Sequence, residues 1–217
     1  MQLGIRIAAE EEPNFEFYTS RLGIRYQDII KLYEQKIKNN KRFELKMLHF
    51  FINTGIKDSA YYWSELHKAL RMYCRLKQVC PELSIINIGG GLPVPNSLYF
   101  DYDYDYMLSE IVLQVKKVCK EEQVPVPDIY SEFGKYTVAE SGSMAFSVLQ
   151  QKQQNDRERW YMIDGSLMTT LPDSWGIGER FILLPLNKWE NEYHRVNIGG
   201  LSCDQYDYYN SEVHVAE

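Results

Sequence analysis

The sequence lacks the features that mark several large classes of protein. It has no run of about 18 apolar residues, which excludes a conventional membrane-spanning helix. Its four cysteines form no Cys-x-x-Cys pair, so a zinc site is not indicated, and four cysteines in 217 residues do not suggest a disulfide framework. No Asn-x-Ser/Thr glycosylation acceptor is present. Together these absences favour the reducing cytoplasm as the compartment of the protein.

The chain also has fewer basic than acidic residues. Lys and Arg number 24 against 30 Asp and Glu, and the formal net charge of −6 argues against a nucleic acid or an anionic membrane as the main partner. The chain opens on Met-Gln-Leu-Gly-Ile-Arg-Ile, without the basic, apolar and small-residue order of a secretory leader. The histidines have no metal-ligand spacing, and the run 101–105 lacks the glycine and glutamate that complete a calcium loop, so we expect no metal site.

What is present in residues 1–135 is an alternation of strand and helix patterns. Short apolar runs predict strands, and apolar residues at spacings of three and four predict helices. The expected strands are Leu3–Ile7, Leu45–Ile52, Leu83–Ile88 and Val126–Tyr130; the expected helices are Tyr26–Lys38, Asp58–Val79 and Tyr104–Glu122. This order predicts an α/β fold with a parallel sheet and helices outside it. Four such strands would make half of an eight-stranded barrel, although periodicity alone does not distinguish a barrel from an open sheet.

The chain changes character after residue 140. Strand-like segments separated by polar turns follow, and no helical stripe is visible; the segments are Ser147–Gln151, Trp160–Ile163, Phe181–Leu186 and Arg195–Ile198. We therefore expect two domains, an α/β domain over 1–140 and an antiparallel β module over 141–217. The chain opens almost inside a strand-like run and stops without a closing element, so we expect it to be a fragment of a longer protein.

Three motifs are candidates for ligand binding or catalysis. Gly89-Gly90-Gly91 follows a strand directly, where backbone N–H groups can approach an anion, although a tight turn explains it equally well. Glu132 ends the next strand, at the same edge of the sheet, and alone it could be a surface carboxylate. Cys203-Asp204 follows Gly199-Gly200 in a polar loop, unlike the buried position that a lone cysteine usually takes.

Taken together, the motifs resemble a known family. A strand ending in Gly-Gly-Gly, then Ser131-Glu-Phe-Gly-Lys135, then Gly199-Gly-Leu-Ser-Cys-Asp204, is similar to the alanine-racemase-like (fold-type III) pyridoxal-phosphate decarboxylases. The stretches Leu171–Ile177, Phe181–Leu186 and Leu201–Asp204 most resemble the biosynthetic arginine decarboxylases. The resemblance implies that 1–140 is the C-terminal half of a (β/α)8 barrel and 141–217 the opening of an antiparallel β domain. The chain would then be an internal fragment.

The resemblance also implies roles for individual residues. The loop that holds the cofactor phosphate corresponds to Gly89, Gly90 and Gly91, and the adjacent phosphate-side turn corresponds to Gly134 and Lys135. Thr54 can offer a hydroxyl to the phosphate. Glu132 corresponds to the carboxylate that faces the pyridine nitrogen and keeps it protonated. Cys203 corresponds to the residue that returns a proton to the substrate carbon, and Asp204 to the residue that reads the basic end of the substrate. In this family that loop reaches into the partner subunit, which implies a homodimer or higher oligomer with shared active sites.

Three departures from the family pattern stand out. The usual His-Phe-His is His49-Phe50-Phe51 here, so Phe51 replaces the imidazole that stacks on the cofactor ring. The usual Glu-Pro-Gly-Arg is Glu132-Phe133-Gly134-Lys135, and a lysine lacks the two-pronged guanidinium. The Schiff-base lysine belongs to the first barrel strand, which has no counterpart in this chain.

The function expected from the resemblance is decarboxylation of L-arginine to agmatine and CO₂, for polyamine and spermidine biosynthesis, by the full-length parent. Without the Schiff-base lysine, the 217-residue chain by itself is not expected to be active. Two alternatives remain open. The parent could act on diaminopimelate, ornithine or carboxynorspermidine, or it could be a non-catalytic paralogue that regulates an active subunit, as Phe51 and Lys135 would allow.

Overall fold

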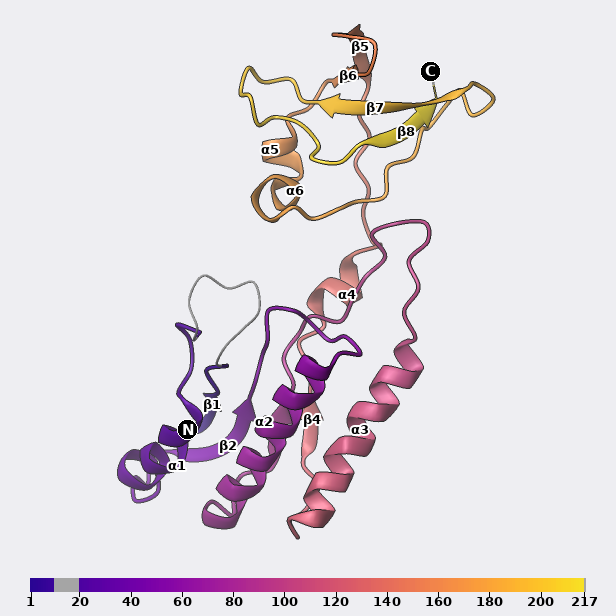
Figure 1. The fold of residues 1–217 in the computed structure, drawn as a ribbon. Helices are drawn as coiled ribbons and strands as arrows, with labels where there is room; N and C mark the ends of the chain where they lie inside the picture. Colours follow the sequence, from indigo (N-terminus) through magenta and orange to yellow (C-terminus); the bar gives the residue numbers. More distant parts are fainter. Residues whose placement is uncertain (10–19, 217) are drawn as a thin grey trace. The chain divides into compact units, whose positions relative to one another are not determined.

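The computed structural model describes residues 1–9 and 20–216, and the chain divides into two compact units. The first unit comprises Met1–Val94 and Tyr102–Glu140; the second comprises Pro95–Asp101 and Ser141–Glu217. Figure 1 shows the two units, each of which is described by itself below. Within the described residues, no helix is both long enough and apolar enough to cross a membrane.

The first unit is a four-stranded sheet covered by helices. Its strands are β1 (Gln2–Arg6), β2 (Glu44–His49), β3 (Ile85–Asn87) and β4 (Asp128–Tyr130), paired in the order β1-β2-β3-β4. All three pairs are parallel, as the strand–helix alternation predicts. The connections hold one helical segment of changing pitch, with η1 (Tyr26–Asp28), α1 (Ile29–Leu32) and η2 (Tyr33–Ile37), and then the long helices α2 (Ala60–Val79) and α3 (Tyr104–Glu121).

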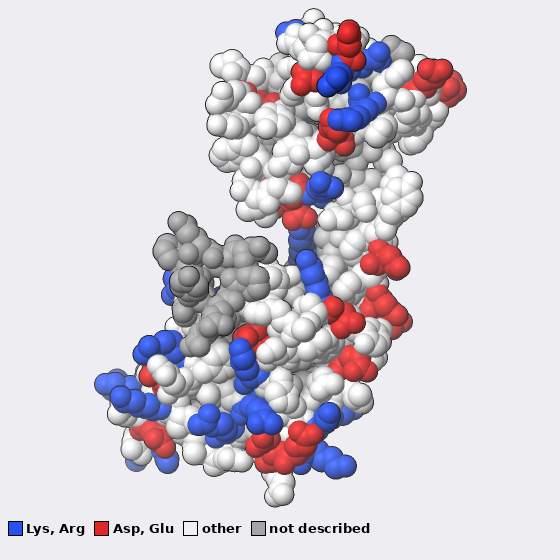
Figure 2. Space-filling view, viewed as in Figure 1, with Lys and Arg blue, Asp and Glu red and all other residues white. Residues whose placement is uncertain are grey.

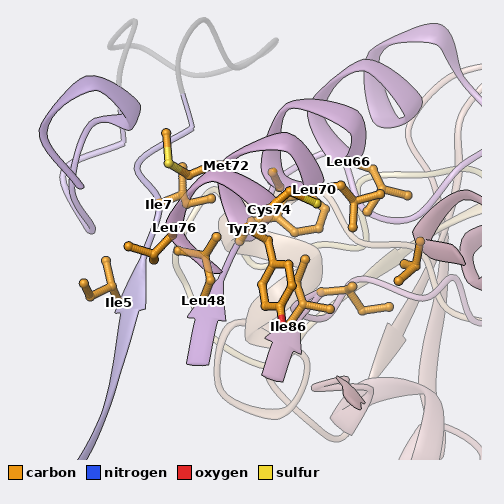
Figure 3. Packing of buried hydrophobic residues seen from close by; sticks show 14 of the residues in the cluster. Ile5, Ile7, Leu48, Leu66, Leu70, Met72, Tyr73, Cys74, Leu76 and Ile86 are labelled. Carbon is orange, nitrogen blue, oxygen red and sulfur yellow. The ribbon is translucent and has the colours of Figure 1, made fainter. Parts of the chain in front are cut away.

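Helix α2 supplies much of the core of this unit. Its apolar residues recur at helical spacing and pack against side chains of β1, β2 and β3, as Figure 3 shows for Leu66, Leu70, Tyr73, Leu76, Leu48 and Ile86. The Ser59 hydroxyl caps the helix by accepting a hydrogen bond from the Tyr62 N–H at 3.2 Å. The helix ends at Val79, directly before Cys80-Pro81, because proline disfavours helical geometry in the residue that precedes it. The packing of α2 thus holds in place the sheet whose strands lead into the glycine loop and Glu132.

Helix α3 begins in the acidic run 101–105. The Asp103 carboxylate accepts a hydrogen bond from the Tyr106 N–H at 2.9 Å, so it caps the helix. Among the described residues no group of three or more acidic, histidine or cysteine side chains could hold a metal ion. On the face shown in Figure 2, Asp and Glu lie along the side of the first unit that holds α3, whereas Lys and Arg gather near α1. Asp103 of the acidic run thus serves as the N-cap of α3.

The second unit contains a mixed sheet, which corrects the antiparallel arrangement expected from the sequence. Strands β5 (Val148–Gln153), β6 (Arg159–Ile163), β7 (Tyr193–Gly199) and β8 (Val213–Ala216) pair in that order. The β5–β6 and β7–β8 pairs are antiparallel, but β6 and β7 are parallel. A long crossover between residues 163 and 193 makes this possible, because a parallel pair needs a connection of a dozen or more residues.

That crossover holds two short helices that sequence periodicity did not predict, α5 (Leu167–Thr170) and α6 (Pro172–Ile177). Helix α4 (Gly134–Val138), after β4, was missed for the same reason: one turn is too short to show a 3.6-residue period. The expected strand at Phe181–Leu186 is wrong. Its backbone pairs with no strand; Phe181 donates its N–H to the Tyr209 hydroxyl and accepts from it with its carbonyl. Phe181 and Leu183 pack on the small core of the unit, which explains the alternating pattern.

Candidate functional site

The carboxyl ends of the parallel strands meet at one edge of the first unit's sheet. Arg6 of β1 pairs with His49 of β2. His49 pairs with Asn87 of β3, which pairs in turn with Tyr130 of β4. Each motif singled out in residues 1–140 lies in the loop that follows one of these strand ends. The candidate site is therefore this edge, the usual place for ligands in parallel α/β sheets.

The glycine loop after β3 requires all three of its glycines. Gly89 and Gly91 have φ values of +71° and +92°, in the left-handed region that favours glycine. A Cβ atom on Gly90 would lie 2.7 Å from the Glu132 carbonyl oxygen, and one on Gly91 would lie 2.8 Å from the Cα of Gly55. The loop is thus packed backbone against backbone, while Gly90 and Gly91 keep part of their surface exposed.

Glu132 is linked to this loop by a backbone hydrogen bond and, through Asn87, by its side chain. Its N–H donates to the Gly89 carbonyl at 2.9 Å, and its side-chain Oε1 accepts a hydrogen bond from Asn87 Nδ2 at 2.8 Å. The other end of the Asn87 amide, Oδ1, accepts from the Gly89 N–H at 2.8 Å. Because one buried carboxamide bonds to both, the conformation of the loop and the direction of the carboxylate are set together.

This bridge gives a first prediction. Replacing Asn87 by alanine leaves the buried Gly89 N–H without an acceptor and Glu132 without its amide donor, so the free energy of unfolding of the first unit should fall by about 1–3 kcal/mol. Hydrogen exchange of the β2 and β3 amides measures the loss. Asn197 is a matched control, since it stands in the same Asn-Ile-Gly-Gly sequence in the second unit. An equal loss of β2 and β3 protection in Asn197→Ala would contradict the prediction.

His49 of β2 lies near this carboxylate, and Arg6 of β1 lies near His49. His49 Nε2 lies 3.7 Å from Glu132 Oε1, too far for a hydrogen bond. Burial lowers the pKa of His49, and the Arg6 charge lowers it further, whereas the Glu132 charge opposes the shift. The Arg6 guanidinium carbon also lies 5.3 Å from the centre of the Phe51 ring, within range of a cation–π interaction. Arg6 therefore contacts the one ring that departs from the family pattern.

The lowered pKa of His49 predicts a pH dependence of stability. A buried neutral imidazole must take up a proton on unfolding, so its contribution is present above the unfolded pKa of about 6.5 and is lost as the pH falls toward the folded value. Urea unfolding between pH 7.5 and pH 5.5 should show this loss in the wild-type chain and less of it in His49→Asn. The matched control is His67→Asn on α2, which should keep the wild-type slope. An unchanged slope in His49→Asn would refute the assignment.

Thr54 lies in the turn after β2, beside the glycine loop. The next residue, Gly55, packs against Gly91, and the Ile56 N–H donates to the Gly91 carbonyl at 2.9 Å. The Thr54 hydroxyl is buried and has no hydrogen-bond partner among the described residues. A buried hydroxyl of this kind is normally satisfied, so the Thr54 oxygen is a group that a ligand in the loop could complete.

The remaining predicted residues belong to α4 of the first unit and to a loop of the second unit. Gly134 and Lys135 begin helix α4, and the Gly134 N–H donates to the Glu132 carbonyl at 2.8 Å, so the turn continues directly from Glu132. Both are exposed. Cys203 and Asp204 belong to the second unit, where they lie in an exposed loop after β7. The structure thus gathers Thr54, Phe51, the glycines and Glu132 at one edge, and it places the Cys-Asp pair in a separate unit.

Sequence reasoning missed Asn87 and Arg6, and it named His49 only as the first residue of the His49-Phe50-Phe51 run. Each is the last residue of its strand. A polar residue that ends an otherwise apolar strand was the available signal, because the parallel arrangement brings such ends together at one edge.

Comparison with known proteins adds a family match to this geometry. A family model described as "Pyridoxal-dependent decarboxylase, pyridoxal binding domain" matches residues 1–139. A biosynthetic arginine decarboxylase of Geobacter sp. (strain M21) is 28% identical over 165 residues, which cover 70% of this chain and 26% of that protein. The chain therefore spans about a quarter of the length of this curated relative.

Solved structures share the fold at lower identity. The lysine decarboxylase of Selenomonas ruminantium has a TM-score of 0.78 at 19% identity and covers 100% of this chain, which corresponds to 54% of that chain. The diaminopimelate decarboxylase of Helicobacter pylori, complexed with L-lysine, has a TM-score of 0.77 at 19% identity, over 100% of this chain and 53% of that one. At such identities the likeness shows the fold alone.

Proposed function

The chain belongs to the pyridoxal-dependent decarboxylases through their pyridoxal-binding domain, and from this premise we propose that the full-length protein removes CO₂ from L-arginine to give agmatine for polyamine biosynthesis. The observation that carries the proposal is the pairing of the glycine loop with Glu132 at one sheet edge. The choice of arginine is supported by the curated relatives, which are biosynthetic arginine decarboxylases at 28% identity.

The residues of this edge fit pyridoxal phosphate. Gly90 is partly exposed and Gly91 is exposed, so their main chain is accessible to a ligand, whereas Gly89 is buried beside Phe51. The Thr54 hydroxyl is an unsatisfied donor beside that loop, which suits a phosphate oxygen. Glu132, held by Asn87, offers an anionic acceptor to a ring nitrogen. An anion cradle and a carboxylate side by side match the two polar ends of this cofactor.

The role of each residue follows from this fit. Bound pyridoxal phosphate supplies a ring that accepts the electron pair left when CO₂ departs. The Gly89–Gly91 loop would hold the phosphate through the N–H groups of Gly90 and Gly91, since the Gly89 N–H already donates to Asn87 Oδ1. Thr54, Gly134 and Lys135 would assist. Glu132 keeps a proton on the ring nitrogen, Phe51 supports a ring face, Cys203 returns a proton to the substrate carbon, and Asp204 binds the guanidinium of arginine.

The same proposal extends to the domains of the full-length protein. Residues 1–140 would form half of a (β/α)8 barrel and 141–217 the first part of a β domain, with the remaining strands and the Schiff-base lysine elsewhere in the parent. We further propose a homodimer or higher oligomer in which the Cys203-Asp204 loop completes the active site of a partner subunit.

Release of ¹⁴CO₂ from carboxyl-labelled amino acids by the full-length protein tests the function. We expect L-arginine to be decarboxylated faster than lysine, ornithine or diaminopimelate. Faster release from one of the other three would support the alternative substrate. No release from any of them, with pyridoxal phosphate bound, would favour the second candidate function, a regulatory paralogue. Phe51 and Lys135 favour that candidate because neither reproduces the imidazole and guanidinium of the family pattern.

A further inference from the structure

The loop that carries Cys203 and Asp204 is exposed along its whole length, but the residues at its two ends are buried. Residues 201–206 are all exposed, whereas Gly200 before them and Asp207 after them are buried. Within six residues the chain leaves the core of the second unit, presents its side chains and returns. Such a segment needs an anchor to hold one conformation, since its own side chains bury little surface.

The anchor is the Asp207 carboxylate, which is only 5% exposed. Its Oδ1 accepts a hydrogen bond from the Leu167 N–H at 2.8 Å, which ties the loop to the start of α5. Its Oδ2 accepts from the Ser202 N–H at 3.0 Å, within the loop itself. One buried carboxylate therefore connects the residue before Cys203 to a separate element of the unit.

The backbone around Asp207 closes the loop as well. The Gly200 N–H donates to the Asp207 carbonyl at 2.7 Å, and the Asp207 N–H donates to the Asp204 carbonyl at 3.1 Å. A Cβ atom on Gly200 would lie 2.2 Å from Asp207 Oδ1, so the glycine is what lets the carboxylate enter. Gly200 of the motif thus makes room for Asp207.

The charge state of Asp207 agrees with this geometry. Burial by itself would raise the pKa of Asp207, but hydrogen bonds from Ser202, through its side chain and its N–H, and from Leu167 and Ser166 outweigh burial and lower the pKa. The anionic form is therefore the one that the surrounding donors stabilise.

We propose that Asp207 is a positioning residue that holds the loop 201–206 in the conformation presenting Cys203 and Asp204 to substrate. The functional part of this inference rests on the roles proposed above for those two residues. The structural part does not, because it concerns only the bonds of Asp207 within its own unit. Asp207 itself need not touch substrate or cofactor.

Hydrogen exchange and spin labelling test the structural part without cofactor or substrate. In Asp207→Ala the Leu167 and Ser202 amides should exchange at least about tenfold faster, since each loses its acceptor. In Asp207→Asn at least one of the two should do so, because asparagine keeps one oxygen acceptor and replaces the other by an NH₂ donor. Cys203 is the exposed one of the four free cysteines, so a nitroxide attached to it should become more mobile. Gly200→Ala, which displaces the carboxylate, should give the same two changes.

The control is Asp164→Asn. Asp164 is an exposed carboxylate of the same unit that accepts a single backbone bond, from the Ser147 N–H at 2.9 Å. It should leave Leu167, Ser202 and the Cys203 label unchanged. Unchanged exchange in the Asp207 variants would overturn the proposal. So would an equal loss of protection along β7, because Asp207 would then stabilise the whole unit and not the loop.

Activity of the full-length protein tests the functional part. Asp207→Asn should lower kcat for CO₂ release by at least about tenfold, whereas Asp164→Asn should not. If the loop loosens as expected while kcat is unaffected, the positioning role is refuted even though Asp207 anchors the loop. If the wild-type protein releases no CO₂, the proposed function has failed, and the exchange result still stands by itself.

Discussion

Replacing Glu132 by glutamine is expected to slow CO₂ release by the full-length protein by about two to four orders of magnitude. Glutamine has nearly the same shape and can still accept the hydrogen bond from Asn87. It carries no charge, however, and so cannot keep a proton on the ring nitrogen of the bound cofactor, on which the electron-accepting property of the ring depends. The loss should therefore appear in kcat for CO₂ release.

Steady-state kinetics of ¹⁴CO₂ release measure the effect. Glu121→Gln is the matched control, because Glu121 is an exposed residue at the end of α3, far along the chain from the glycine loop. It should retain the wild-type rate. A Glu132→Gln protein that keeps more than about a tenth of the wild-type kcat would show that the carboxylate does not have the proposed role.

The second large effect is expected at Gly91. Alanine there must adopt a φ of +92° and bring its Cβ to 2.8 Å from the Cα of Gly55, a clash between two backbones that no side-chain rotation relieves. The left-handed conformation alone costs about 1–2 kcal/mol, and the clash forces the two loops apart. Because the loops carry the proposed phosphate donors, affinity for pyridoxal phosphate should fall by at least about a hundredfold.

Equilibrium binding of pyridoxamine 5′-phosphate, followed by fluorescence, measures this loss. The control is Gly142→Ala, since a Cβ on Gly142 meets no atom within 4 Å and its φ is not in the left-handed region. It should bind as the wild type does. The phosphate-free analogue pyridoxamine should distinguish the variants less than the phosphorylated ligand does; an equal loss for both analogues would indicate general disruption and would refute the assignment of the loop to phosphate.

The sequence was sufficient for the parts of the fold that depend on long, periodic patterns. The apolar stripe of Asp58–Val79 predicted the helix observed as α2, Ala60–Val79, and the strand–helix alternation predicted the parallel sheet. It was insufficient for segments whose conformation depends on partners distant in the chain. The Phe181–Leu186 segment alternates like a strand, yet its backbone contacts the Tyr209 hydroxyl. The parallel β6–β7 pair likewise depends on a crossover that carries no periodic signal.

Some residues of the candidate site could likewise be predicted from the sequence, and others could not. Gly89–Gly91 and Glu132 could be singled out because glycine runs and strand-end carboxylates are visible in the sequence. Asn87 could not, since its importance comes from two hydrogen bonds to residues 2 and 45 positions away. Asp207 could not be singled out from the sequence either. Its burial and its bond to Leu167, 40 residues earlier, are properties of the folded unit.

The central claim is that the carboxyl edge of the parallel sheet binds pyridoxal phosphate, with Glu132 facing the ring nitrogen. The most direct measurement is the ¹⁵N chemical shift of ring-labelled 4′-deoxypyridoxine 5′-phosphate bound to the protein, because this analogue has no aldehyde and needs no lysine. We predict the shift of a protonated ring nitrogen in the wild type and of an unprotonated one in Glu132→Gln. A bound analogue whose ring nitrogen is unprotonated in the wild type, or equally protonated in both proteins, would contradict the claim.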